Sequence, residues 1–158
     1  MQIGDRAPEF ELQDQEGQWR SLAQFVEAGP LVLYFYPIDF SPVCTAQACA
    51  MRDRYDSAAV KGIQIVGVSA QSVASHARFA AMHELPFPLL ADPDKRVIKA
   101  YDADGFMGFG TRRVTYLIDA QAVIRNRVVA DLTIGAHKAL LEKVVAEWPP
   151  IRGDDAAP

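Results

Sequence analysis

The chain has 158 residues, of which 50% are hydrophobic and 23% are charged, and its formal net charge is −4. This length suits a single domain with a sizeable core, and a negative charge without a basic cluster argues against nucleic-acid binding. No apolar run approaches the roughly 18–20 residues that a membrane helix needs. The N-terminus lacks a charged segment followed by an apolar one. We therefore expect no signal peptide, no membrane partner and a cytoplasmic location.

The first half of the chain predicts a hairpin followed by alternating strands and helices. Residues 7–20 alternate loosely between apolar and polar, with Glu16-Gly17 in the turn. The continuously apolar run 31–36 is typical of a strand that is covered on both faces. The remaining elements expected here are one helical turn over 21–26, a helix over 44–60 closed by Lys61-Gly62, and a second central strand over 63–69.

The second half predicts further strand and helix units. A helix over 72–85 begins at Ser72, a favoured N-cap residue. Another helix runs to Tyr101, with Asp92 as its N-cap and Pro93 as its first helical residue. The other expected elements are a strand over 87–90, a loop over 102–110, two strands over 113–118 and 123–129 that form a hairpin, and a final amphipathic helix over 135–148 that places Leu140, Leu141, Val144 and Val145 on one side before Pro149-Pro150.

This order of elements predicts an α/β fold. Alternating strand and helix units give parallel strands with helices on both faces, and the last hairpin adds antiparallel strands. The expected architecture is a thioredoxin-like fold with a mixed central sheet flanked by helices and an N-terminal β-hairpin extension. We expect one domain over 1–150 and a flexible C-terminal tail over 151–158.

The only two cysteines, Cys44 and Cys49, lie where the helix after the first central strand begins. A cysteine at a helix N-terminus meets the positive end of the macrodipole and unpaired N–H groups, which favour the reactive thiolate. Five residues of helix separate two Cα atoms by about 8–9 Å, whereas a disulfide needs roughly 4.4–6.8 Å. The pair can therefore form a disulfide only if the first turns of the helix unwind.

Two thiols that are held apart suggest sequential chemistry. A thiolate that attacks an oxidant becomes a sulfenic acid, and a second thiol condenses with it and releases water. Cys44, at the helix start, is the better attacker, and Cys49 is the candidate resolving thiol. The plain alternative is that both are small buried hydrophobic residues, and the spacing alone does not decide between the two. We expect no metal site and no cofactor, because no other cysteine or nearby histidine completes a ligand set.

The residues around Cys44 resemble the active site of peroxiredoxins. The motif from Pro37 through Ser41 to Cys44 is similar to the family's Pro-x-x-x-(Thr/Ser)-x-x-Cys pattern. A second cysteine five residues on, at Cys49, resembles the bacterioferritin-comigratory, or peroxiredoxin Q, group. Further matches at 4–12 and 113–119 extend the resemblance over essentially the whole chain, and residues 1–150 would then form a peroxiredoxin domain.

The resemblance implies roles for five residues. Cys44 would attack the peroxide O–O bond, and Cys49 would resolve the sulfenic acid into a Cys44–Cys49 disulfide that thioredoxin or glutaredoxin reduces. Ser41 would hydrogen-bond the peroxide, Arg113 would hold the thiolate and polarise the departing oxygen, and Pro37 would shield the site. Backbone N–H groups at the helix start, including that of Cys44, would add donors. The implied substrates are hydrogen peroxide and organic hydroperoxides, and we expect a monomer.

Ordinary roles stay open for these residues. Ser41 is suited to be a helix N-cap, Pro37 to end a strand, and only the family match selects Arg113 over its neighbour Arg112. Gln47 stands where the group commonly has Glu, which alters the charge or hydrogen bonding of the helix.

Other polar and apolar candidates have simpler explanations. Asp39 and Phe40 are expected to line the loop before Cys44, and Asp92 to cap a helix rather than bind a metal. The 102–110 loop is shorter than in many relatives. Its apolar residues would form either a lip near the pocket or ordinary packing: Phe106, Met107 and Phe109. The three histidines are scattered and are expected to face solvent or lie on helix faces: His76, His83 and His137.

Thiol peroxidase is the leading functional hypothesis, and two others compete with it. A thioredoxin-type disulfide oxidoreductase is opposed by the five-residue cysteine spacing and by the absence of a proline just before Arg113. A redox-sensing interaction protein would use helix unwinding to expose a partner surface. Insulin reduction would identify the first alternative, and failure to turn over peroxide would favour the second.

Overall fold

The computed structural model of the chain describes residues 1–147. The expected end of the last helix at Trp148, the two prolines after it and the tail expected over 151–158 lie outside the described residues. Within the described part of the chain, no helix is long and apolar enough to cross a membrane.

Seven strands form one mixed sheet in the order β2-β1-β5-β4-β3-β6-β7. β4 pairs in parallel with β3 and β5, which helical crossovers join. The pairs β6–β7 and β1–β2 add antiparallel hairpins on the two sides, so the expected mixed sheet and N-terminal hairpin are confirmed. The strands are β1 (Glu11–Gln13), β2 (Trp19–Ser21), β3 (Leu31–Phe35), β4 (Gln64–Ser69), β5 (Leu89–Ala91), β6 (Val114–Ile118) and β7 (Ile124–Val129).

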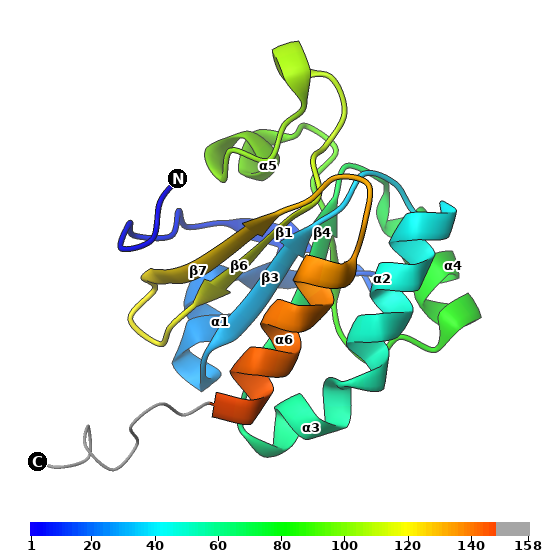
Figure 1. Cartoon of the computed structure of the whole chain (residues 1–158). Coiled ribbons are helices and arrows are strands. Elements are labelled where there is room, and N and C mark those ends of the chain that lie inside the picture. The colour runs from blue at the N-terminus through cyan, green and yellow to red at the C-terminus, as the bar shows by residue number, and fades with distance from the viewer. Residues whose placement is uncertain (148–158) are drawn as a thin grey trace, which may run out of the picture.

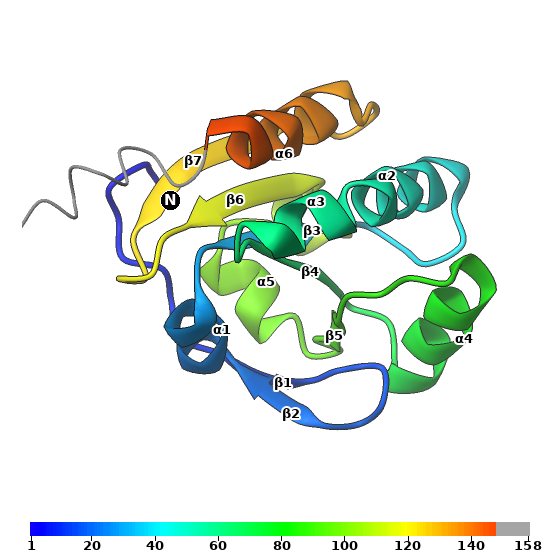
Figure 2. The same cartoon turned by 90° about the horizontal axis from the view of Figure 1, so that it is seen from below.

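Helices cover both faces of the sheet (Figures 1 and 2). α2, α3, α4 and α6 pack on one face, while α1 and α5 pack on the other. This three-layer arrangement is the expected thioredoxin-like architecture. The helices are α1 (Leu22–Ala28), α2 (Pro42–Asp53), α3 (Tyr55–Val60), α4 (Val73–His83), α5 (Arg96–Ala100) and α6 (Gly135–Glu147), with a short 3-10 turn, η1, at Phe106–Gly108.

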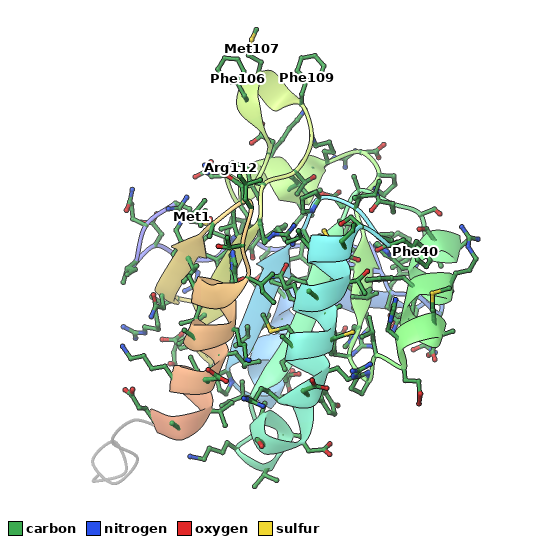
Figure 3. All side chains as sticks on the ribbon, turned by 45° about the vertical axis from the view of Figure 1, so that its right-hand side comes forward. Met1, Phe40, Phe106, Met107, Phe109 and Arg112 are labelled. Carbon is green, nitrogen blue, oxygen red and sulfur yellow. The ribbon has the colours of Figure 1, made fainter. Side chains whose placement is uncertain are left out.

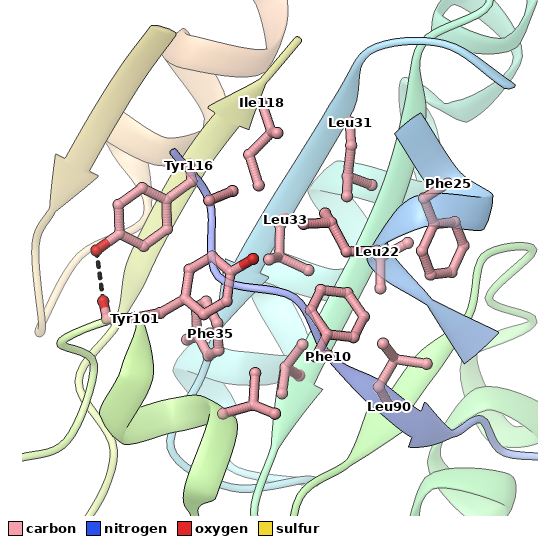
Figure 4. Packing of buried hydrophobic residues seen from close by; sticks show 14 of the residues in the cluster. Phe10, Leu22, Phe25, Leu31, Leu33, Phe35, Leu90, Tyr101, Tyr116 and Ile118 are labelled. Carbon is pink, nitrogen blue, oxygen red and sulfur yellow. Dashed lines mark hydrogen bonds between the residues drawn. The ribbon is translucent and has the colours of Figure 1, made fainter. Parts of the chain in front are cut away.

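The central strand β3 serves two hydrophobic cores. Leu33 and Phe35 belong to the core under α1 and α5, which Figure 4 shows from close by. Val32 and Tyr34 belong to the core under α2, α4 and α6. Every residue of β3 is at most 1% exposed, which explains why the strand is apolar throughout rather than alternating. The segment that leads to Cys44 therefore leaves from the best-packed strand of the sheet.

The prediction of one helix over 44–60 is wrong in two respects: the helix begins earlier, and two helices occupy this range. α2 begins two residues earlier because Ser41 is the N-cap and Pro42 occupies the first turn, where its missing N–H is not needed. The helix breaks at Arg54, where ψ is 1°, and α3 follows. No glycine or proline marks this break. The new direction packs the buried Ala58 of α3 against the sheet, a tertiary contact that local sequence does not encode.

The helix predicted from Pro93 also begins later, at Arg96. A turn comes first, in which the N–H of Lys95 donates to the backbone oxygen of Asp92 at 2.9 Å and Lys95 adopts a φ of 59°. The Asp92 carboxylate still accepts from the backbone N–H groups of Arg96 and Ile98. The predicted N-cap position of Asp92 is therefore wrong, because the N-cap is Lys95, although the Asp92 side chain does satisfy N–H groups in the first turn of α5.

Other helix ends agree better with the sequence. Ser72 accepts from the backbone N–H of Ser75, which confirms the predicted cap of α4. α1 extends beyond the single predicted turn because Ser21 and Gln24 form a reciprocal capping box. The expected apolar side of α6 is buried at Leu140, Leu141 and Val144 and half-buried at Val145.

Replacing Leu33 by alanine tests the packing of β3. Leu33 is fully buried, so the Leu33→Ala variant should lose about 2–5 kcal/mol of unfolding free energy through lost transfer energy and a cavity. Urea unfolding followed by circular dichroism measures this. Val60→Ala is the control, because Val60 is 87% exposed and should change stability by less than about 0.5 kcal/mol. Equal effects of the two substitutions would contradict the assigned core.

Candidate active site

Cys44 lies in the first turn of α2 and is 1% exposed. The Oγ of Ser41 accepts from the N–H of Cys44 at 3.3 Å, and the backbone oxygen of Ser41 accepts from the N–H of Thr45 at 2.8 Å. Ser41 is therefore the N-cap. The Cys44 N–H is not the free donor expected from the sequence, because its place in the first turn commits it to the cap.

The guanidinium of Arg113 lies against the Cys44 sulfur. Its Nη2 is 3.4 Å from Sγ, its Nη1 donates to Oε1 of Gln47 at 2.6 Å, and its Nε donates to the backbone oxygen of Asp131 at 3.2 Å. Arg113 is only 3% exposed. Three contacts fix the planar group, so its positive charge is held where it stabilises a thiolate.

Arg112 and Arg113, which sequence alone left equivalent, have opposite environments. Arg112 points to solvent (Figure 3), where it forms a two-pronged ion pair with Asp131 at 2.8–3.3 Å. The hydrogen bond from Arg112 lowers the pKa of the Asp131 carboxyl below its ordinary value. Asp131 also accepts from the backbone N–H of Arg113 at 3.1 Å. Arg112 and Asp131 thus brace the segment that holds Arg113.

His137 is fully buried. Of the two positions expected for it, the solvent-facing one is wrong, and the residue lies on the buried face of helix α6. Its Nε2 lies 3.0 Å from the backbone oxygen of Ala130, and its Nδ1 lies 2.7 Å from Oγ1 of Thr115. Burial lowers the pKa of His137. The ring is therefore neutral, donating from Nε2 and accepting at Nδ1. The partners come from β6 and from the segment after β7, so the pattern of α6 by itself did not reveal them.

Cys49 is half-buried further along α2, and both cysteines are free thiols. α2 runs without a break from Pro42 to Asp53. The two thiols therefore lie on one continuous helix, where five residues of rise keep their Cα atoms beyond the range of a disulfide. Pro37 is half-buried at the end of β3, between the sheet and the segment that carries Ser41.

A buried polar network holds the segment before α2, and sequence analysis missed it. The Asp39 carboxylate accepts from the Tyr36 hydroxyl at 2.6 Å, from the Ser75 hydroxyl at 2.7 Å and from Nδ1 of His76 at 2.7 Å. Burial by itself raises the pKa of Asp39, but the hydrogen bond and charge of His76, with the two hydroxyls, lower it below its ordinary value.

His76 is fully buried and Asp39 is 4% exposed. Of the two positions expected for His76, the solvent-facing one is wrong, and the residue lies on the buried face of helix α4. The partners are 37 positions apart in the chain, and nothing in the local pattern links them. One signal for this network was available in the sequence: Asp39 is a charged residue shortly after a fully apolar strand. A charge that becomes buried there needs a partner.

Two further polar groups lie near the reactive sulfur. Among the described residues, the Tyr34 hydroxyl and Nε2 of Gln47 are buried without a hydrogen-bond partner. Burial, and after it the charge of Cys44, raises the pKa of Tyr34, so its phenol stays protonated. Both groups can therefore still donate a hydrogen bond to an acceptor that enters the site.

The loop over 102–110 projects from the end of the molecule where α2 begins (Figure 3). Its three apolar side chains are 78–86% exposed: Phe106, Met107 and Phe109. The ordinary-packing interpretation of these residues is therefore wrong, while the hydrophobic lip stays a prediction. A cavity of about 760 Å³ lies elsewhere, between β1, α5 and the start of α4. No group of three or more potential metal-ligating acidic, cysteine or histidine residues occurs within residues 1–147.

The arrangement around Cys44 is that of an activated nucleophile. The thiol sits in the first turn of a helix, at the positive end of the macrodipole, and a fixed guanidinium faces it. Both features place positive charge beside the sulfur, and the nucleophilic form of a cysteine is the negatively charged thiolate. Cys44 is 1% exposed, so water does little to screen these charges.

Comparison with known proteins places the chain in a family. Residues 3–127 match the model of the AhpC/TSA family. Peroxiredoxin Q, chloroplastic, of Oryza sativa subsp. japonica is 41% identical over 147 residues, which cover 89% of this chain and 67% of that protein. The Triticum aestivum protein of the same name is 42% identical over 124 residues, covering 77% of this chain and 56% of the wheat sequence. The chain thus spans between about half and two thirds of these relatives' lengths.

Solved structures agree with this assignment. The peroxidoxin BcpB of Mycobacterium tuberculosis superposes with a TM-score of 0.86 and 30% identity, over 94% of this chain and 98% of that one. A cysteine-to-serine mutant of Xylella fastidiosa PrxQ gives a TM-score of 0.84 and 28% identity, over 93% and 97%. The fold agrees with these matches, and the chain belongs to the AhpC/TSA family, in its peroxiredoxin Q group.

Proposed function

We propose that this protein is a thiol peroxidase that reduces hydrogen peroxide and organic hydroperoxides. The observation that carries the proposal is the 3.4 Å contact between Nη2 of Arg113 and Sγ of Cys44 at the start of α2. The Xanthomonas campestris bacterioferritin comigratory protein, described for its alkyl peroxide reduction activity, is 27% identical with a TM-score of 0.79 over 87% of this chain and 91% of that one. That relative supports the choice of substrate class.

In the first step the Cys44 thiolate attacks the terminal peroxide oxygen. An S–O bond forms as the O–O bond breaks, giving Cys44 sulfenic acid and an alkoxide or hydroxide that takes a proton. Arg113 would stabilise the charge that moves from sulfur to the departing oxygen. The Ser41 hydroxyl, which caps α2 and lies 3.4 Å from the Ile38 carbonyl, would orient the peroxide, with Pro37 shielding the site.

In the second step the Cys49 thiol attacks the Cys44 sulfenic acid. An S–S bond forms, and the hydroxyl leaves as water. Helix geometry requires α2 to unwind between the two cysteines before this bond can form. Thioredoxin, or glutaredoxin, would then reduce the disulfide by exchange and become oxidised itself. We also propose that the protein works in a reducing compartment such as the cytoplasm, because the cycle consumes a thiol reductant. We further propose that it works as a monomer.

Replacing each cysteine separates their roles. Cys44→Ser should abolish peroxide consumption, because no other thiolate faces Arg113. Cys49→Ser should still react with peroxide once but fail to turn over with thioredoxin. NADPH-coupled assays with thioredoxin and its reductase, run with several peroxides, measure both. Peroxide turnover that persists in Cys44→Ser would refute the proposal.

Arg113 and Arg112 form a matched pair for mutation. Arg113→Lys keeps the positive charge but loses the planar guanidinium, whose separate N–H groups contact Gln47, Asp131 and the sulfur at the same time. The rate constant for peroxide attack should fall by about 10²–10³-fold. Arg112→Lys changes an exposed ion pair and should alter that rate constant less than about threefold. Stopped-flow kinetics of the reduced proteins measure this rate constant. If the two substitutions lower it equally, the proposed role of Arg113 is wrong.

Oxidation by one equivalent of peroxide tests the resolving step. The product should have lost the mass of two hydrogen atoms, and peptide mapping should join Cys44 to Cys49. Circular dichroism should show reduced helix content, because the disulfide cannot form while α2 remains fully helical between the two cysteines. A product that carries only a Cys44 sulfenic acid would indicate a cycle that uses one cysteine.

A further inference from the structure

We propose that Asp39 and His76 are a positioning pair that anchors the segment before α2, and so sets the balance between peroxide attack and disulfide formation at Cys44. This inference rests on the proposed function. The contacts of Asp39 and His76 themselves involve neither Cys44, Cys49 nor Arg113, and they reach Cys44 only through the Ser41 cap.

The segment over 37–41 is fixed at one point. Both carboxylate oxygens of Asp39 are engaged, one by the Tyr36 hydroxyl and the other by Ser75 and His76 of α4. The backbone N–H of Asp39 also donates to Oε1 of Gln71 at 2.9 Å. A single residue thus ties this segment to the end of β3, to the β4–α4 connection and to α4.

His76 is itself locked in place. Its Nδ1 faces the Asp39 carboxylate at 2.7 Å, and its Nε2 lies 3.1 Å from the backbone oxygen of Leu90 on β5. Both partner oxygens accept hydrogen bonds, so each ring nitrogen faces an acceptor, and the Nδ1 contact with Asp39 is a buried ion pair whenever the ring carries both protons. The anchor is therefore built on the rigid sheet rather than on α4 alone.

The neighbouring residue shows that this segment needs an anchor. Phe40 adopts a φ of 70°, in the left-handed region that non-glycine residues avoid. Its ring packs edge-on against Phe79 of α4, with centroids 5.1 Å apart. A strained backbone persists only where its surroundings over-determine it. Here the hydrogen bonds of Asp39 hold the backbone before Phe40, and the contact with Phe79 holds the Phe40 side chain.

The anchor acts on the reactive cysteine through the helix cap. Ser41 lies two residues after Asp39 and accepts the N–H of Cys44. If Asp39 is released, Ser41 no longer stays at the cap position and the first turn of α2 frays. Fraying separates Cys44 from Arg113 and slows peroxide attack, but it is also the start of the unwinding that brings Cys44 to Cys49. The two steps should therefore respond in opposite directions.

A buried ion pair also suits a positioning role better than a stabilising one. Removing two charges from water carries a penalty that apolar side chains of similar size would avoid. Such a pair fixes the relative positions of the groups it joins, because its hydrogen bonds are directional. Here it fixes the position of the segment that carries Pro37 and Ser41.

The test uses Asp39→Asn, which keeps the shape and removes the charge. Rapid-quench mass spectrometry of the reduced full-length protein measures peroxide attack and disulfide formation as separate rate constants. We expect peroxide attack to slow by about tenfold or more and disulfide formation to become faster. The yield of Cys44 sulfinic acid at high peroxide should fall, because faster resolution leaves less sulfenic acid to be oxidised again.

Two variants serve as controls. Ser75→Ala removes one of the contacts and should give a smaller change in the same directions. Asp14→Asn removes an equally buried carboxylate, 3% exposed and paired with Arg20 in the N-terminal hairpin, and should leave the ratio of the two rate constants unchanged. If Asp39→Asn slows both steps by the same factor, or changes neither, the positioning role is wrong.

Hydrogen exchange separates failure of this inference from failure of the proposed function. In the reduced protein without peroxide, Asp39→Asn should increase amide exchange over residues 42–49 by about tenfold or more, and Asp14→Asn should not. This readout is independent of catalysis. Inactive wild-type protein would refute the peroxidase, whereas unchanged exchange in Asp39→Asn would refute the anchor.

Discussion

The contact between the Arg113 guanidinium and the Cys44 sulfur is the interaction on which the rest of the site depends. The two residues are 69 positions apart and meet because β3 and β6 are neighbours in the sheet. α2 leaves from the end of β3, and Arg113 directly precedes β6. The fold thus brings the positive end of a helix and a fixed cation to one buried sulfur.

This site is built from supports on several elements. Gln47 of α2 and the backbone of Asp131 orient the guanidinium, while His137 of α6 is hydrogen-bonded to Ala130 in the same segment as Asp131. On the other side of Cys44, Asp39 is bound to α4. In the proposed mechanism these supports have a common consequence: they favour the folded α2 of the peroxide step and oppose the unwinding that a Cys44–Cys49 disulfide would require.

Elements with a strong local signal were predicted well. The apolar run of β3 and the Ser72 cap of α4 agree with the structure. The helix over 44–60 did not, because its break at Arg54 is made by packing of α3 on the sheet rather than by a helix-breaking residue. His76 and His137 were expected to face solvent or lie on helix faces, and their burial among polar partners was missed for a similar reason. A histidine on an amphipathic helix counts as polar until its buried partners are known.

The sequence by itself determined the fold class, the family and the identity of the candidate cysteines, because these depend on periodicity and on motifs within a short stretch of chain. It also determined that Cys44 and Cys49 cannot join within an intact helix, since that follows from helix rise alone. Only the tertiary structure decided between Arg112 and Arg113, paired Asp39 with His76 and committed the Cys44 N–H to Ser41. Those outcomes depend on which side chains meet across the sheet and between helices, and residues distant in the chain carry no local signal of such contacts.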